Sequence, residues 1–196
     1  MELQGERLIP ADLQRTWSAL NDPDTLKACI AGCESLERTG DHSFKSVVAV
    51  KVGPVNARFN GKLEITNLQP PRGYTINFEG QGGAAGFGRG NAKVNLSPAL
   101  EGSGCELSYT AHAQVGGKIA QVGQRLVDGV AKSMAEDFFR RFEEEMQRRY
   151  PQQVAADAAL ESAAVAPPPT GKRMPVWVWG VFALVVVVAL LLLIRR

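Results

Sequence analysis

The sequence predicts an α+β fold in which a curved antiparallel sheet packs around a long C-terminal helix. Strand-like segments follow one another between residues 35 and 115, each separated from the next by glycine or proline. Residues 118–150 then change to a helical period, with apolar side chains every three or four positions. A third observation shows that the domain does not extend to the C-terminus. An uncharged apolar run at residues 176–194 lies outside this pattern and is long enough to cross a membrane.

A strand and two short helices are expected at the N-terminus. Residues 1–9 can form the strand. Residues 11–20 carry apolar side chains at helical spacing, namely Leu13, Trp17 and Leu20. A second short helix is predicted to follow Asp22 and Pro23 and to end at Gly32.

The sheet is predicted from six strand-like segments that come next. They cover residues 35–38, 43–52, 57–68, 74–79, 88–96 and 106–115. The breaks between them fall at Gly40, Gly53-Pro54, Pro70-Pro71, Gly102 and Gly104. This spacing is typical of an antiparallel meander, whose sheet can have one dry face and one wet face.

The predicted helix at residues 118–150 has an apolar stripe and a charged outer face. The stripe comprises Ile119, Val122, Leu126, Val130, Met134, Phe138, Phe142 and Met146. It can lie along the dry face of the sheet, so the elements together describe a helix-grip arrangement. Gly123 and Gly129 cost about 1 kcal/mol each against alanine inside a helix, which suggests room for a ligand or close packing on the sheet.

Composition divides the chain into a domain at residues 1–150, an Ala/Pro-rich flexible linker at 151–174 and a transmembrane tail anchor at 175–196. At about 1.5 Å per residue, the uncharged run spans about 28 Å, close to the thickness of a bilayer core. Trp177 and Trp179 sit at the start of the run, and four basic residues bracket it, namely Lys172, Arg173, Arg195 and Arg196. Residues 1–9 lack the apolar core of a secretion signal. The domain is therefore expected in the cytoplasm, held at the inner (cytoplasmic) membrane by a single C-terminal pass.

Charge and cysteine content limit the function classes. The predicted domain contains 18 Lys and Arg against 18 Asp and Glu, and this balance argues against nucleic acid as a partner. Cys29, Cys33 and Cys105 are odd in number and follow no export signal, so they are expected to be reduced and partly buried. His42 and His112 lie far from Cys29 and Cys33 in sequence, so no metal site is expected.

Several stretches resemble the G-subunit family of carbon monoxide dehydrogenase, within the START-like, polyketide-cyclase-like (SRPBCC) helix-grip superfamily. They are WSALNDP (17–23), CIAGCE (29–34), GPVNARFNG (53–61), GQGGAAGFGRGNA (80–92), GGKIAQVGQR (116–125) and Phe138-Phe139. Their order and spacing carry the resemblance. Ala31 stands where the family pattern has proline, a departure that should loosen one turn.

The resemblance implies a non-enzymatic accessory protein that recruits a molybdenum hydroxylase of the carbon monoxide dehydrogenase type to the membrane. The fold implies an apolar cavity between sheet and helix, which suits a respiratory quinone (menaquinone or ubiquinone) or another isoprenoid lipid, with no covalently bound cofactor. Two alternatives stay open, a cyclase- or hydrolase-like enzyme acting on a hydrophobic substrate and a general lipid carrier. The sequence contains no motif that supplies a nucleophile beside a base, so no catalytic residue is predicted.

The predicted cavity residues are apolar positions of the sheet and of the helix stripe. They are Phe59, Leu63, Ile65, Ile76, Phe78, Phe87, Val94, Ile119, Val122, Gly123, Leu126, Val130 and Met134. The glycine-rich stretch at 80–90 precedes strand-like residues, so it lacks the strand-to-helix context of a dinucleotide fingerprint. It is predicted to be a flexible loop at the cavity mouth, with Phe87 as a gate or as a packing residue.

Overall fold

The computed structural model describes residues 1–100 and 104–151 of this chain. The predicted anchor at 175–196 lies outside these residues, as does the predicted linker at 151–174 except for Pro151. Within the described part, no helix is both long enough and apolar enough to cross a bilayer.

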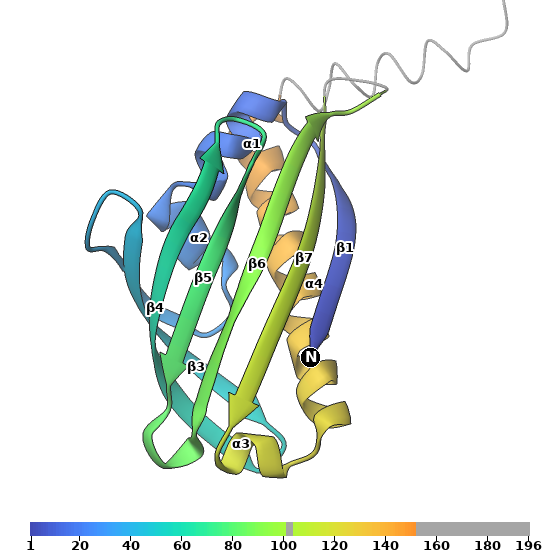
Figure 1. The fold of residues 1–196 in the computed structure, drawn as a ribbon. Helices are drawn as coiled ribbons and strands as arrows, with labels where there is room; N and C mark the ends of the chain where they lie inside the picture. The colour runs from blue at the N-terminus through green and yellow to red at the C-terminus, as the bar shows by residue number, and fades with distance from the viewer. Residues whose placement is uncertain (101–103, 152–196) are drawn as a thin grey trace, which may run out of the picture. The chain divides into compact units, whose positions relative to one another are not determined.

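Within the described residues, one antiparallel sheet of seven strands forms the body of the domain, in the order β1-β7-β6-β5-β4-β3-β2 (Figure 1). The strands are β1 (Glu2–Ile9), β2 (Cys33–Arg38), β3 (Ser43–Val52), β4 (Val55–Gln69), β5 (Gly73–Gln81), β6 (Phe87–Pro98) and β7 (Cys105–Gly116). Neighbours from β2 to β7 follow one another in sequence, which confirms the predicted meander. The N-terminal strand pairs with β7, from Glu2 opposite His112 to Ile9 opposite Cys105.

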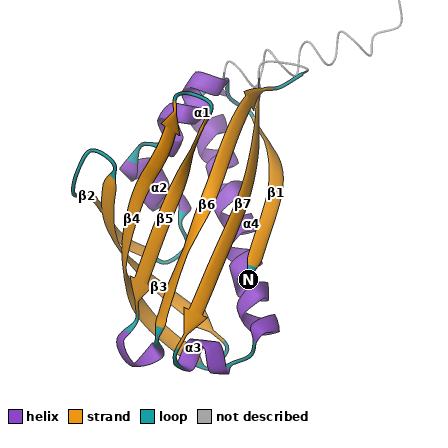
Figure 2. Ribbon diagram, in the orientation of Figure 1, coloured by secondary structure: helices purple, strands orange, loops and turns teal. Residues whose placement is uncertain are grey.

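Alternation along the strands gives the sheet a polar outer face and a largely apolar inner face. In β6, Arg89, Asn91 and Lys93 are exposed, whereas Val94 is half-buried and Leu96 is buried. Side chains two positions apart share a face, so this pattern places every second residue against the helices. The two short N-terminal helices and the long C-terminal helix lie together on the inner side of the sheet (Figure 2).

Two short helices, α1 (Leu13–Leu20) and α2 (Pro23–Cys29), follow β1 and are each started by an aspartate. The Asp12 carboxylate accepts a hydrogen bond from the Arg15 backbone N–H at 2.8 Å. Asp22 caps α2, where Pro23 occupies the first turn and has no N–H that needs a partner. Both helices were predicted, although α2 ends at Cys29, before the predicted end at Gly32.

The predicted single helix at 118–150 is wrong, because the chain forms two helices there. These are α3 (Lys118–Gln121) and α4 (Gln124–Arg149). Gly123 separates them with φ +99°, a left-handed conformation that side chains disfavour. Gly123 is therefore the residue at which the chain turns. The prediction that it lies inside a helix is wrong.

This break changes which side chains α4 buries. Leu126 is 41% exposed, whereas the next residue, Val127, is buried. Phe139, Phe142 and Met146 are also buried on α4, and burial of Phe142 and Met146 agrees with the predicted stripe. The predicted stripe assumed one continuous helical period from Ile119 onwards. Because α4 is a separate helix that begins after Gly123, the buried face of its first turn does not follow from the period of the residues before Gly123.

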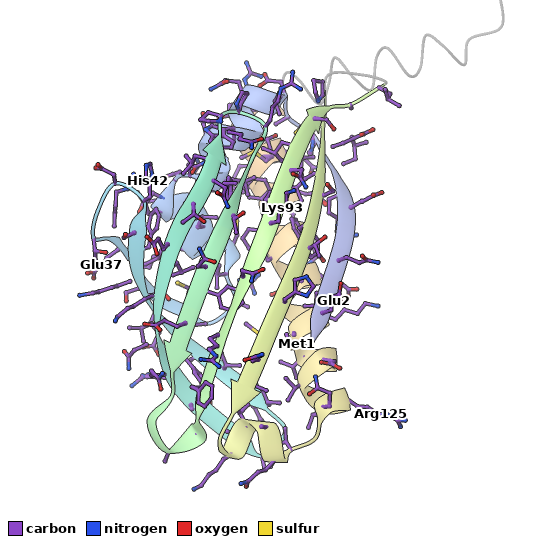
Figure 3. The ribbon with its side chains drawn as sticks, viewed as in Figure 1. Met1, Glu2, Glu37, His42, Lys93 and Arg125 are labelled. Atoms are coloured by element: carbon purple, nitrogen blue, oxygen red, sulfur yellow. The ribbon has the colours of Figure 1, made fainter. Side chains whose placement is uncertain are left out.

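The best-sealed part of the core lies where the C-terminal half of α4 meets α1, α2, β1 and β7. Phe142, Met146, Ile9 and Cys105 are completely buried there. Full burial of one such large side chain contributes roughly 1.5–3 kcal/mol. In contrast, Glu37, His42 and Arg125 extend away from the domain (Figure 3).

Candidate functional site

An apolar cavity of about 170 Å³ lies between the inner face of the sheet and the helices. Every strand from β2 to β7 contributes to its wall, together with α1, α2 and α4. The thirteen lining residues are Leu20, Leu26, Ile30, Leu36, Phe44, Leu63, Ile65, Tyr74, Ile76, Val94, Leu107, Phe138 and Phe139.

The register of the strands brings together the residues at the centre of the cavity wall. Ile65 of β4 is directly opposite Ile76 of β5. Tyr74, two residues before Ile76 on the same face, is opposite Val94 of β6. These four side chains therefore form a contiguous patch on the inner face, because directly opposed residues of antiparallel strands project to the same side.

Tyr74 is the one residue of this wall with a polar side-chain atom. It is 4% exposed, and its ring meets the Trp17 ring edge-to-face with 5.5 Å between centroids. Burial raises the pKa of the Tyr74 hydroxyl well above its ordinary value of 10. The side chain is thus a neutral phenol in an apolar surrounding.

The chemistry of the wall defines what the cavity can hold. Its thirteen side chains include no charged group, so an ionised ligand would lose its hydration without gaining a counter-charge. Drug-sized ligand pockets are roughly 300–1,000 Å³, whereas an engineered apolar cavity of about 150 Å³ binds benzene. In this conformation the cavity suits a neutral group about the size of one ring.

Four of the thirteen predicted cavity residues line this cavity, namely Leu63, Ile65, Ile76 and Val94. Phe59 and Phe78 are also on the inner face, but their rings cover glycines and do not line the cavity. A Cβ on Gly90 would lie 2.9 Å from Phe78 Cζ, and one on Gly82 would lie 2.6 Å from Phe59 Cε1. The two rings therefore fill space that the glycines leave open.

The remaining predicted residues belong to the other end of the fold or to its surface. Ile119 is buried in a separate cluster with Val52 and Val127, against which Val122 and Val130 pack. Met134 is half-buried on α4, Leu126 is exposed and Gly123 has open space around it.

Phe87 is placed on the outer face, which corrects its predicted role at the cavity mouth. It is 38% exposed and alternates with Gly88, which faces inward. Its ring covers Gly116, where a Cβ would lie 2.4 Å from Phe87 Cε1. The glycine-rich stretch is not one loop either, since β5 extends to Gln81 and β6 begins at Phe87.

Sequence reasoning missed nine residues of the cavity wall, chiefly those from α1, α2, the C-terminal half of α4 and the β2–β3 hairpin. They are Leu20, Leu26, Ile30, Leu36, Phe44, Tyr74, Leu107, Phe138 and Phe139. One signal was available: Tyr74, Ile76 and Phe78 alternate and so had to share a face. The packing of α2 against β2, which brings Leu26 and Leu36 together, has no comparable sequence signal.

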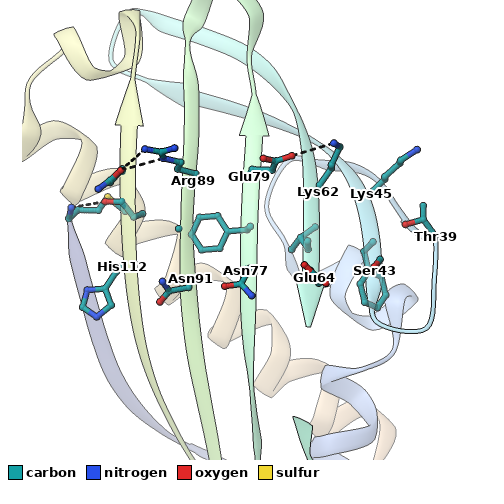
Figure 4. Close-up of a pocket in the computed structure, with 17 residues that line it drawn as sticks. Thr39, Ser43, Lys45, Lys62, Glu64, Asn77, Glu79, Arg89, Asn91 and His112 are labelled. Atoms are coloured by element: carbon teal, nitrogen blue, oxygen red, sulfur yellow. Dashed lines mark hydrogen bonds and ion pairs between the residues drawn. The ribbon is translucent and has the colours of Figure 1, made fainter. Parts of the chain in front are cut away.

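A larger depression of about 980 Å³ lies on the outer face and is open and polar (Figure 4). Lys62 and Arg89 form pairs across neighbouring strands. Lys62 Nζ is 3.4 Å from Glu79 Oε1, and Arg89 Nη2 is 3.2 Å from Gln114 Oε1. Exposed pairs of this kind contribute about 0–1 kcal/mol each. This face is a hydrated surface, so the inner cavity is the candidate site for an apolar ligand.

A seven-stranded antiparallel sheet that grips a C-terminal helix, with an apolar cavity enclosed between them, defines a helix-grip domain of the ligand-binding type. The family model for the G subunit of carbon monoxide dehydrogenase (CoxG) matches residues 5–147. The chain belongs to this family. None of the curated proteins with which the chain was compared matches it.

Solved structures agree with this assignment. A conserved protein from Geobacillus kaustophilus is 33% identical, with a TM-score of 0.71 over 76% of this chain and 96% of that chain. The fold thus makes up nearly the whole of that relative, which shows that such a domain folds without a further domain. A Thermus thermophilus protein (22% identity, TM-score 0.57, 76% and 99% covered) and the ZhuI aromatase/cyclase of a Streptomyces species (13%, 0.54, 76% and 94%) share the fold.

Proposed function

We propose that this protein is a non-enzymatic, membrane-anchored accessory protein that binds an apolar ligand and recruits a molybdenum hydroxylase of the carbon monoxide dehydrogenase type. Family membership supports the accessory role. The single observation that carries the ligand-binding half is the inner cavity, whose thirteen lining residues include one polar side chain and no charge.

The proposed ligand is the head group of a respiratory quinone. A soluble dehydrogenase has to pass electrons to a quinone that is dissolved in the membrane, and an anchored protein that holds the head group can present it to the enzyme. The neutral wall suits a neutral quinone, and the volume suits one ring. A two-ring menaquinone head group and any isoprenoid tail therefore require side chains to move or the tail to leave the cavity.

A cavity-filling variant tests the ligand half. Leu63→Trp places a larger side chain in the cavity wall, while Leu126→Trp adds the same bulk at an exposed position. We expect an organic-solvent extract of protein purified from a quinone-rich host to contain quinone or isoprenoid lipid for the native chain and for Leu126→Trp, but not for Leu63→Trp. An extract of the native protein without either compound would contradict this half.

A truncation tests the recruitment half. Removal of residues 174–196 takes away the predicted anchor and leaves the described domain complete. The partner hydroxylase is expected to leave the membrane fraction and to co-purify with the soluble truncated protein. A hydroxylase that stays in the membrane fraction without these residues would contradict the proposed tether.

The alternative functions make different predictions. A cyclase or hydrolase needs an acid/base pair or a nucleophile beside a base in the pocket, and the cavity wall offers one hydroxyl group. A carrier unrelated to any dehydrogenase would share the cavity but would not co-purify with a hydroxylase. The likeness to an aromatase/cyclase concerns the fold.

A further inference from the structure

The hydroxyl group of Tyr74 lacks a partner although the side chain is almost completely buried. Among the described residues it takes part in no hydrogen bond, and burial alone raises its pKa. In the same part of the chain, the one side-chain polar atom that is both unpaired and sealed from water is Arg141 Nε. The unpaired Tyr74 oxygen therefore keeps some accessible surface, and Tyr74 lines the cavity.

A phenol is an unfavourable choice for a wall that only packs. An unpaired hydroxyl loses its hydrogen bonds to water on burial, whereas phenylalanine fills nearly the same volume without a polar atom. Phe44, Phe138 and Phe139 show that this wall accepts phenylalanine elsewhere. The hydroxyl at position 74 therefore calls for a partner that the protein itself does not supply.

Water is a poor candidate for this partner. A buried water usually makes about three hydrogen bonds, so a water beside Tyr74 would lack most of its partners. Tyr74 supplies the single polar side chain of the wall. A ligand that is apolar over most of its surface and carries one hydrogen-bond acceptor meets both requirements of the cavity.

We propose that the Tyr74 hydroxyl donates a hydrogen bond to a carbonyl oxygen of the ligand and so selects neutral carbonyl compounds over hydrocarbons of the same shape. The inference rests on the proposed function and names the group that orients the ligand. The edge-to-face contact with Trp17 and the register opposite Val94 hold the tyrosine ring in place. Because the phenol is neutral and the wall has no cation, a carboxylate or phosphate gains no counter-charge.

Two probes of matched shape test this selection. Acetophenone carries a carbonyl oxygen where isopropylbenzene carries a methyl group, and neither reacts with the free cysteines. Their affinities are measured by NMR titration of residues 1–151, for which the Geobacillus relative supports independent folding. Native protein is expected to bind acetophenone more tightly than isopropylbenzene.

Tyr74→Phe is the decisive variant. It is expected to lower the affinity for acetophenone about three- to tenfold, which is the range of one neutral hydrogen bond. The affinity for isopropylbenzene should stay within about twofold of the native value. Tyr109→Phe is the matched control, because Tyr109 stacks on Phe139 and does not line the cavity. It should leave both affinities unchanged.

A second measurement needs no variant. The ¹³C resonance of carbonyl-labelled acetophenone is expected to move downfield from its position in alkane solvent when the ligand is bound to the native protein. An alkane-like shift, or equal effects of Tyr74→Phe on both probes, overturns the role of Tyr74 but leaves the apolar cavity intact. If native protein binds neither probe, the proposed ligand-binding function fails as well.

Discussion

Asp22 and Arg149 lie 127 positions apart in sequence, yet Arg149 Nη1 donates to Asp22 Oδ2 at 3.3 Å. Asp22 is the N-cap of α2, and Arg149 is the last residue of α4. The same carboxylate accepts hydrogen bonds from the Thr25 hydroxyl and the Asp24 backbone N–H. One side chain thus starts α2 and ties it to the far end of α4.

This contact predicts a pH-dependent stability. The Thr25 hydrogen bond, followed by the backbone and Arg149 contacts, holds the pKa of Asp22 below its ordinary value of 3.8. Because its folded pKa is lowered, the carboxylate stabilises the fold above about pH 4, and this contribution is lost as the pH falls through the folded pKa. Asp22→Asn retains a capping side chain without the charge, so it should lower the free energy of unfolding by about 0.5–1 kcal/mol at pH 7.

Urea denaturation at pH 7 and at about pH 2.5 measures this effect. Arg149→Gln is the matched control, since it removes one partner of Asp22 and keeps the cap. It should have a smaller effect than Asp22→Asn at pH 7. A difference between native protein and Asp22→Asn that persists unchanged at the lower pH would contradict the assignment.

Two residues of the predicted stripe on α4, one buried and one exposed, should respond to alanine substitution to different extents. Phe142 is completely buried and stacks on Phe138 with 5.9 Å between ring centroids. Phe142→Ala should therefore lower the free energy of unfolding by about 3–5 kcal/mol. Leu126→Ala, at a 41% exposed position, should cost less than about 1 kcal/mol. Equal costs in chemical denaturation would mean that Leu126 is buried, as the predicted stripe placed it.

The connection between β5 and β6 offers a matched pair of glycines. Both have positive φ, but a Cβ on Gly86 would lie 1.9 Å from the Gly116 carbonyl oxygen, whereas one on Gly83 meets nothing within 4 Å. Gly83→Ala should cost about 1–2 kcal/mol from backbone strain alone. Gly86→Ala adds a clash with the backbone and should cost more than about 2 kcal/mol. Thermal unfolding compares them, and a Gly86→Ala variant as stable as Gly83→Ala would refute the tight packing of this loop on β7.

The three free cysteines should differ in reactivity. Burial raises the pKa of the Cys29 thiol to about 11, and Cys105 is completely buried, while Cys33 is half-buried. Since only a thiolate reacts, Cys33 should be labelled first by a disulfide reagent at pH 8, and all three should react in denaturant. Labelling of Cys29 should accelerate as the pH approaches 11.

Cys33→Ser tests whether the fast phase of labelling comes from Cys33. It should remove the fast phase of labelling in the native protein and leave two thiols in denaturant. A fast phase that survives in this variant would show that Cys29 or Cys105 is accessible in the folded state.

Local pattern determined the strands and the two small helices. The predicted segment at 43–52 matches β3, and the order of elements needed no long-range information, because alternation and turn residues act within a few positions. Family membership was also readable from short stretches spread over most of the domain, and the family model confirms it.

Tertiary packing decided where the cavity lies. Glycines on the inner face admit the rings of Phe59 and Phe78, which cover them, and the remaining space lies toward α2. Which apolar side chain covers which neighbour depends on how helices and strands meet in space. The spacing of residues along the chain does not contain that information.

The sequence by itself determined the class of this protein, a sheet that grips a C-terminal helix, because periodicity is a local property. Only the tertiary structure decided that Gly123 breaks the helix, that Phe87 faces water and that Tyr74 meets the cavity. The last two depend on contacts between segments distant in sequence, and burial is a property of the assembled fold.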